Sequence, residues 1–130
     1  MASLEAAARI AQSFPEVTEG SRLGSRTWLV SGKAFAWERG FSKADLKRFG
    51  DVQPPDGPIL AVRVDDVVEK EAILASGVVG IFTIPHFDGY PAVLIQLRKI
   101  KAPQLREALT DGWLACAPRK LAESYLERRR

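Results

Sequence analysis

Apolar residues follow a helical spacing at both ends of this chain, whereas its middle holds short apolar runs separated by glycine. The first helical pattern starts after Ser3, a preferred N-cap residue, and stops at Pro15. Two more helical patterns follow Pro103 and Pro118. Each proline is expected in the first turn of its helix, where proline is favoured. Helices at both ends with strands between them predict an α+β fold, in which an antiparallel β-sheet is flanked by N-terminal and C-terminal helices.

The middle of the chain predicts a β-meander followed by further strands. The pair Ser31-Gly32 suits a tight hairpin turn, because glycine takes positive φ without penalty. The predicted strands are residues 18–23, 27–30, 34–37, 59–64, 78–84 and 92–97.

Two helical segments interrupt these strands. Asp66 and Glu69 have capping-box spacing, which predicts a helix that begins near Asp65 and ends at Gly77. Residues 41–58 mix charged residues with glycine and proline, and are predicted to form a helical turn followed by a loop.

The length of 130 residues predicts one domain that spans the chain, 1–130. A composition of 46% hydrophobic and 27% charged residues is typical of globular proteins and argues against disorder. No stretch approaches the roughly 20 apolar residues of a membrane helix, so no membrane partner is expected. The N-terminus lacks the basic start and apolar centre of a secretory signal, which predicts a cytoplasmic location.

Four segments resemble the MmcQ/YjbR-like family in order and spacing over nearly the whole chain. They are residues 14–20 (FPEVTEG), 28–36 (WLVSGKAFA), 90–95 (YPAVLI) and 117–121 (APRKL). The resemblance implies an α+β fold akin to the CyaY/frataxin type, for which a double-wing mode of DNA binding has been suggested. Iron-binding frataxins carry an acidic ridge along their first helix, whereas the first helix here offers only Glu5, so we do not expect an iron chaperone.

Catalytic and metal chemistry find little support in the residue types. His86 is the only histidine and Cys116 the only cysteine, and no spacing resembles a zinc site or a Cys-His pair. Cys116 is interpreted as a small buried apolar residue. No glycine-rich loop follows a strand and opens a helix, as phosphate-binding motifs require. We therefore expect no metal, no cofactor and no enzymatic activity.

Basic residues are concentrated toward the C-terminus. Residues 98–130 hold nine lysines and arginines against four acidic residues, while the preceding residues hold ten against twelve. If the first meander and the late strand are adjacent in the sheet, two basic wings would straddle a phosphate backbone. The candidate phosphate-binding residues are Arg22, Arg26, Lys33, Arg98, Lys99 and Lys101. The alternative is that these are ordinary solvated charges, and that Trp28, Phe35 and Trp37 serve the core.

The most unusual local sequence is the loop from His86 to Tyr90. In an extended segment His86 and Asp88 would face the same way and form an orienting pair, with Tyr90 nearby. The competing interpretation is a structural turn with His86 partly exposed. His86, Asp88, Tyr90 and Trp28 are the candidate residues for a ligand or partner.

The sequence thus predicts a non-enzymatic binding domain, with duplex DNA as the first candidate partner. Binding would be directed mainly to phosphates, sensitive to salt and weakly sequence-specific. The alternative is a protein-interaction or small-ligand module that uses the His86 to Tyr90 loop and the aromatic hairpin.

Overall fold

The predicted meander is present in the computed structural model, which describes residues 2–129. Its strands are β1 (Val17–Arg22), β2 (Ser25–Val30) and β3 (Lys33–Glu38). Together with β4 (Ile59–Arg63), β5 (Ile81–Phe82) and β6 (Ala92–Gln96) they form one six-stranded sheet in the order β1-β2-β3-β4-β6-β5. Every neighbouring pair is antiparallel, which confirms the predicted fold class.

Five α-helices and one short 3₁₀ helix accompany the sheet. They are α1 (Leu4–Gln12), α2 (Lys43–Phe49), α3 (Val67–Ala75), η1 (Pro85–Phe87), α4 (Ala102–Cys116) and α5 (Arg119–Arg128). The expected caps are present, because the Ser3 hydroxyl accepts from the Ala6 N–H and the Asp66 carboxylate from the Glu69 N–H. None of the helices between residues 2 and 129 has the length and apolar composition needed to cross a membrane.

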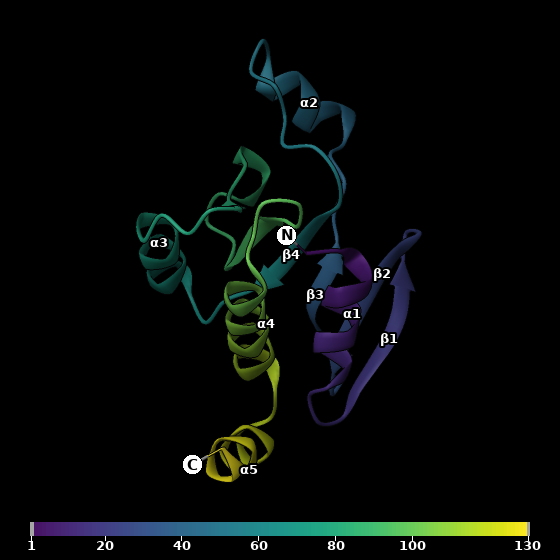
Figure 1. Ribbon diagram of the computed structural model, residues 1–130, viewed down its shortest axis with the longest axis vertical. Helices are drawn as coiled ribbons and strands as arrows, with labels where there is room; N and C mark the ends of the chain where they lie inside the picture. The colour runs from purple at the N-terminus through teal and green to yellow at the C-terminus, as the bar shows by residue number, and fades with distance from the viewer. Residues whose placement is uncertain (1, 130) are drawn as a thin grey trace.

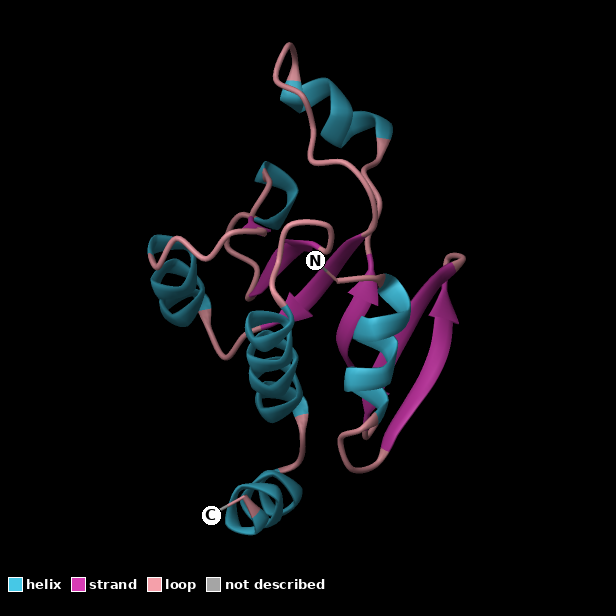
Figure 2. Cartoon of the chain, viewed as in Figure 1, coloured by secondary structure: helices cyan, strands magenta, loops and turns pink. Residues whose placement is uncertain are grey.

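The main core lies between the sheet and the helices α1 and α4, which cover the same sheet face (Figure 1, Figure 2). Trp28 and Trp113 are both fully buried there, as their apolar surroundings in the sequence indicate. Gly112 allows α4 to approach β4 closely, since a Cβ at this position would lie 2.6 Å from Val62 Cγ1. The Trp113 indole donates a hydrogen bond to the Pro15 carbonyl at 3.2 Å and joins the two ends of the chain.

A second, smaller core lies on the opposite sheet face, over β4 and β6. Phe87 of η1 and the half-buried rings of Phe41 and Phe49 pack there. Among residues 2–129, no helix covers the part of this face formed by β1, β2 and β3. That part of the sheet borders a groove.

The strand predicted over residues 78–84 is much shorter in the structure, where β5 holds only Ile81 and Phe82. Gly80 has a φ of 99°, and a Cβ there would lie 2.9 Å from the Ile100 backbone nitrogen. The Gly80 carbonyl still accepts from the Gln96 N–H at 2.7 Å, but the chain turns at Gly80, so regular pairing with β6 begins only at Ile81.

Candidate functional site

A groove of about 590 Å³ runs along the sheet face opposite α1 and reaches the C-terminal end of α4, where Ala115 and Cys116 line it. A second hollow of about 350 Å³ adjoins it and shares Trp37, Arg39 and Tyr90 with it. Both volumes lie within the range of small-molecule sites, about 300–1,000 Å³. A cavity of about 100 Å³ between α3, α4 and the sheet falls well below that range.

The register of β2 and β3 decides which aromatic residue reaches this groove. Trp28 lies opposite Ala36 and Leu29 opposite Ala34, so Phe35 is an extra residue in a β-bulge. The bulge keeps both Phe35 and Ala36 in the helix-covered core and turns Trp37 to the other face. Trp37 is therefore half-buried in the wall of the groove, opposite Thr27 on β2.

Three basic residues line the groove without a carboxylate partner. Arg22 ends β1, Lys33 begins β3 and Arg63 ends β4. Among residues 2–129 no acidic side chain lies within 4.0 Å of their charged nitrogens. The acidic residue that lines the groove is Glu38, so the wall carries an excess of positive charge.

Arg63 and Tyr90 form one wall of the groove together. The Arg63 guanidinium lies 5.5 Å from the centre of the Tyr90 ring, and its Nε donates to the Pro91 carbonyl at 3.2 Å. Tyr90 also lies 6.4 Å from Trp37, measured between ring centres. With an exposed fraction of 40%, Tyr90 keeps part of its ring open to a ligand.

Arg39, the fourth cation at the groove, has a structural role. Its guanidinium pairs with the buried Asp45 carboxylate at 3.0 Å and lies over the Phe87 ring. Burial alone would raise the pKa of Asp45, but hydrogen bonds from the Ser42 backbone N–H and from Arg39 lower that pKa below its ordinary value. This ion pair fixes α2 against η1 and leaves Arg39 less free for a ligand.

The loop that carries Tyr90 is held by Lys70 of α3. The Lys70 ammonium is buried and donates to the carbonyl oxygens of Phe87 at 2.5 Å and Tyr90 at 2.9 Å. Burial lowers the pKa of Lys70, while the nearby Asp88 carboxylate acts in the opposite direction. Lys70 was not among the predicted site residues, although its spacing places it on the helix face that carries Ile73.

The loop is a structural turn rather than an extended segment. Residues Pro85–Phe87 form the 3₁₀ helix η1, so His86 and Asp88 are not alternate residues of a strand. No hydrogen bond joins their side chains in the described part of the chain, and the predicted orienting pair is not formed. His86 is exposed and lines the smaller hollow, whereas the Asp88 carboxylate lies near Lys70.

Two of the predicted site residues, Arg26 and Trp28, belong to the opposite face. Trp28 is fully buried and its Nε1 donates to Glu19 at 3.1 Å, so its assignment to a ligand site is wrong. Arg26 pairs with Glu5 at 2.7 Å and Glu19 at 2.9 Å, and the pKa of Arg26 rises because of these carboxylates. Its charge is neutralised within the fold, as the neighbouring glutamates in the sequence suggest.

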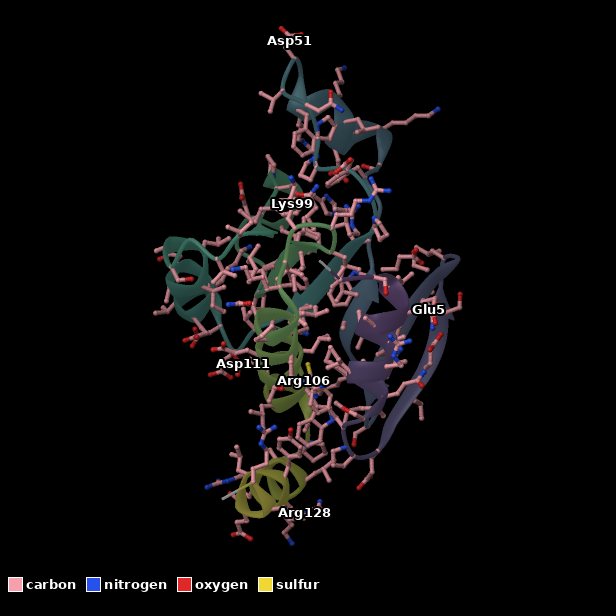
Figure 3. The ribbon with its side chains drawn as sticks, in the orientation of Figure 1. Glu5, Asp51, Lys99, Arg106, Asp111 and Arg128 are labelled. Atoms are coloured by element: carbon pink, nitrogen blue, oxygen red, sulfur yellow. The ribbon has the colours of Figure 1, made fainter. Side chains whose placement is uncertain are left out.

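The late basic residues lie away from the groove. Arg98, Lys99 and Lys101 follow β6, and β4 separates β6 from the meander, so the adjacency required by the two-wing hypothesis is absent. Arg98 pairs with Asp56 at 3.1 Å, and Lys99 lies near the turn that precedes α4 (Figure 3). The structure thus places Arg22 and Lys33 in one groove with Arg63, which was not among the predicted site residues.

Cys116, at the end of α4, also lines the groove, near Arg63 and Lys33. It is buried, with its Sγ 3.9 Å from the Ala34 carbonyl, and burial raises the pKa of the thiol while the charges of Arg63 and Lys33 act in the opposite direction. Between residues 2 and 129, no three histidine, cysteine, aspartate or glutamate side chains gather closely enough to hold a metal ion.

Comparison with known proteins finds three mycobacterial relatives. They are the uncharacterized proteins Rv2570 and MT2646 of two Mycobacterium tuberculosis strains (H37Rv and CDC 1551) and Mb2600 of Mycobacterium bovis. Each is 41% identical to this chain over 129 residues, which cover 97% of both sequences. No protein-family model and no solved structure matches the chain.

Proposed function

This chain belongs to one family with the three mycobacterial proteins, and we propose that it is a non-enzymatic domain that binds nucleic acid in the groove opposite α1. The observation that carries the proposal is the set of three cations, Arg22, Lys33 and Arg63, that line the groove without a carboxylate partner among residues 2–129.

Unpaired cations beside aromatic rings suit a phosphate-bearing ligand. Phosphate contacts by lysine and arginine provide most of the sequence-independent affinity for nucleic acids. A side chain already paired with a carboxylate would have to give up that partner first, as Arg26 and Arg98 would. Binding in the groove is therefore salt-sensitive and weakly sequence-specific. The MmcQ/YjbR-like resemblance implies DNA as the first candidate ligand.

A catalytic role finds no support in the groove. Burial raises the pKa of the Cys116 thiol against the opposite effect of Arg63 and Lys33, so the thiol stays protonated at neutral pH and is a poor nucleophile. His86 lies in the adjoining hollow without an acidic side chain bonded to it in the described residues. We expect the protein to bind its ligand in the cytoplasm without transforming it.

The second candidate function is a small-ligand module that uses the same face. The hollow lined by Trp37, Arg39, His86, Phe87 and Tyr90 has room for a compact aromatic molecule, with an aromatic wall and a histidine at its edge. Such a ligand would bind without any need for Arg22 and Lys33, which lie outside this hollow.

The test is the affinity for DNA measured across a salt series, with an unrelated protein of similar size and net charge as control. We expect the logarithm of the association constant to fall linearly with the logarithm of the salt concentration, with a slope steeper than that of the control. Binding no stronger than the control at low salt would overturn the nucleic-acid proposal and leave the small-ligand module.

A further inference from the structure

The groove holds two kinds of binding group side by side, and only one form of nucleic acid satisfies both. Trp37 and Tyr90 offer aromatic rings, while Arg22, Lys33 and Arg63 offer positive charge. Resting on the proposed function, we infer that the ligand is a single strand, with its bases stacked against Trp37 and Tyr90 and its phosphates at the three cations.

A base pair inside a duplex cannot use the aromatic rings. Both faces of each base are covered by the neighbouring pairs, so a duplex presents phosphates to the protein but no free face for stacking. In a single strand the bases are free to unstack and lie on an aromatic side chain while the backbone follows a basic groove. The duplex would thus lose the contribution of Trp37 and Tyr90.

The aromatic wall is fixed before any ligand binds. Arg63 holds one side of Tyr90 through the cation–π contact and the hydrogen bond to Pro91, and Lys70 holds the Tyr90 carbonyl from the side of α3. Phe87 packs edge-on against Tyr90, with 5.6 Å between ring centres. A side chain that is already ordered loses less conformational entropy when a ligand binds, and this favours stacking on Tyr90.

The charges lie on both sides of the aromatic residues. Arg22 is the last residue of β1, Lys33 is the first of β3 and Arg63 is the last of β4. Trp37 lies on β3, which pairs with β2 and β4. This distribution along the sheet suits several consecutive phosphates better than the single phosphate of a free nucleotide. The chain length of the ligand therefore separates a polymer from a mononucleotide.

The experiment compares three probes on the intact protein by fluorescence anisotropy and competition. They are a labelled oligo-dT of about 15 nucleotides, a duplex of the same length and the mononucleotide dTMP as competitor. We expect the single strand to bind at least about tenfold more tightly than the duplex, and dTMP to compete only weakly.

Tyr90 provides matched variants, because it is partly exposed and its replacement leaves both cores intact. Tyr90→Ala removes the ring and should weaken single-strand binding about tenfold while leaving duplex binding nearly unchanged. Tyr90→Phe keeps the ring and should bind like the wild type. Thermal melts of both variants confirm that they are folded.

Each outcome decides between the proposals. A duplex that binds as tightly as the single strand overturns this inference but leaves nucleic-acid binding in place. Equal affinity for dTMP and the oligonucleotide overturns it in favour of a free nucleotide. If neither single strand nor duplex binds above a protein of matched charge, the proposed function itself is wrong.

Discussion

The guanidinium of Arg63 lies over the ring of Tyr90, with 5.5 Å between its central carbon and the ring centre. Arg63 ends the central strand β4, and Tyr90 lies in the loop that precedes β6. This contact therefore ties a loop residue to the rigid sheet and gives the groove a wall that is both aromatic and positively charged. The groove depends on the placement of this loop, and so do several of the predictions.

Replacing Lys70 should loosen the loop that carries Tyr90. Lys70→Met keeps the apolar stem and removes the two hydrogen bonds to the Phe87 and Tyr90 carbonyls. We expect faster hydrogen exchange at the Phe87, Asp88 and Tyr90 amides, which are hydrogen-bonded within this turn. Lys99→Met, at an exposed lysine, is the control. Unchanged exchange rates in the Lys70 variant would show that the turn holds itself.

Removing either buried tryptophan should destabilise the whole domain. Trp28→Ala and Trp113→Ala each empty a fully buried site between the sheet and the helices, and we expect a loss of roughly 3–5 kcal/mol in the free energy of unfolding. Chemical denaturation measures this loss. A midpoint within error of the wild type for either variant would contradict the described core.

The Asp45 carboxylate should contribute a pH-dependent part of the stability. Its pKa in the folded protein lies below the ordinary value of 3.8, so its contribution is present above that value and is lost as the pH falls through the lower folded pKa. Asp45→Asn should cost about 1–3 kcal/mol at neutral pH, because the hydrogen bond from the Ser42 backbone N–H and the ion pair with Arg39 are weakened.

The cost of Asp45→Asn should shrink as the pH falls below about 4 toward the folded pKa, since the wild-type carboxyl is then protonated too. Urea denaturation at a series of pH values measures it, with Asp51→Asn at an exposed position as control. A cost that stays constant over this range would mean that the charge of Asp45 contributes nothing.

Local signals in the sequence were sufficient to predict most of the secondary structure. Ser3, Asp66 and the two late prolines mark helix starts through local chemistry, and the structure places helices at each of them. The meander was likewise predicted from local signals, namely short β-prone runs separated by glycines that suit turns. The exception, β5, is cut short by the close approach of Gly80 to Ile100, a tertiary contact that no local pattern contains.

The candidate site could be predicted only in part, because it depends on register and tertiary contacts. Trp28 and Trp37 look alike in the sequence, but Trp28 lies on the core side of β2, whereas the bulge at Phe35 in β3 turns Trp37 to the groove. Arg26 and Arg22 also look alike, but Arg26 lies on the opposite sheet face, where it contacts Glu5 and Glu19.

Lys70 and Arg63 were missed for the same reason. One is a lysine inside a charged stretch of a helix and the other a single arginine at the end of an apolar strand. Their roles follow from the position of the loop around Tyr90, which lies about 20 to 30 residues further along the chain and reaches them only in the folded state.

The central claim is that nucleic acid binds in the groove. It is tested most directly by removing the same amount of positive charge from two different sets of three residues. One variant carries Arg22→Gln, Lys33→Gln and Arg63→Gln, and the other carries Arg98→Gln, Lys99→Gln and Lys101→Gln. Both lose the same net charge, but only the first set lines the groove.

The measurement is the salt dependence of oligonucleotide binding for the wild type and both variants. We predict that the groove variant loses affinity and that its slope falls by about 0.7 for each phosphate contact removed from a single strand, while the second variant keeps a slope close to that of the wild type. The opposite pattern, in which the second variant loses the slope and the groove variant keeps it, would contradict the account.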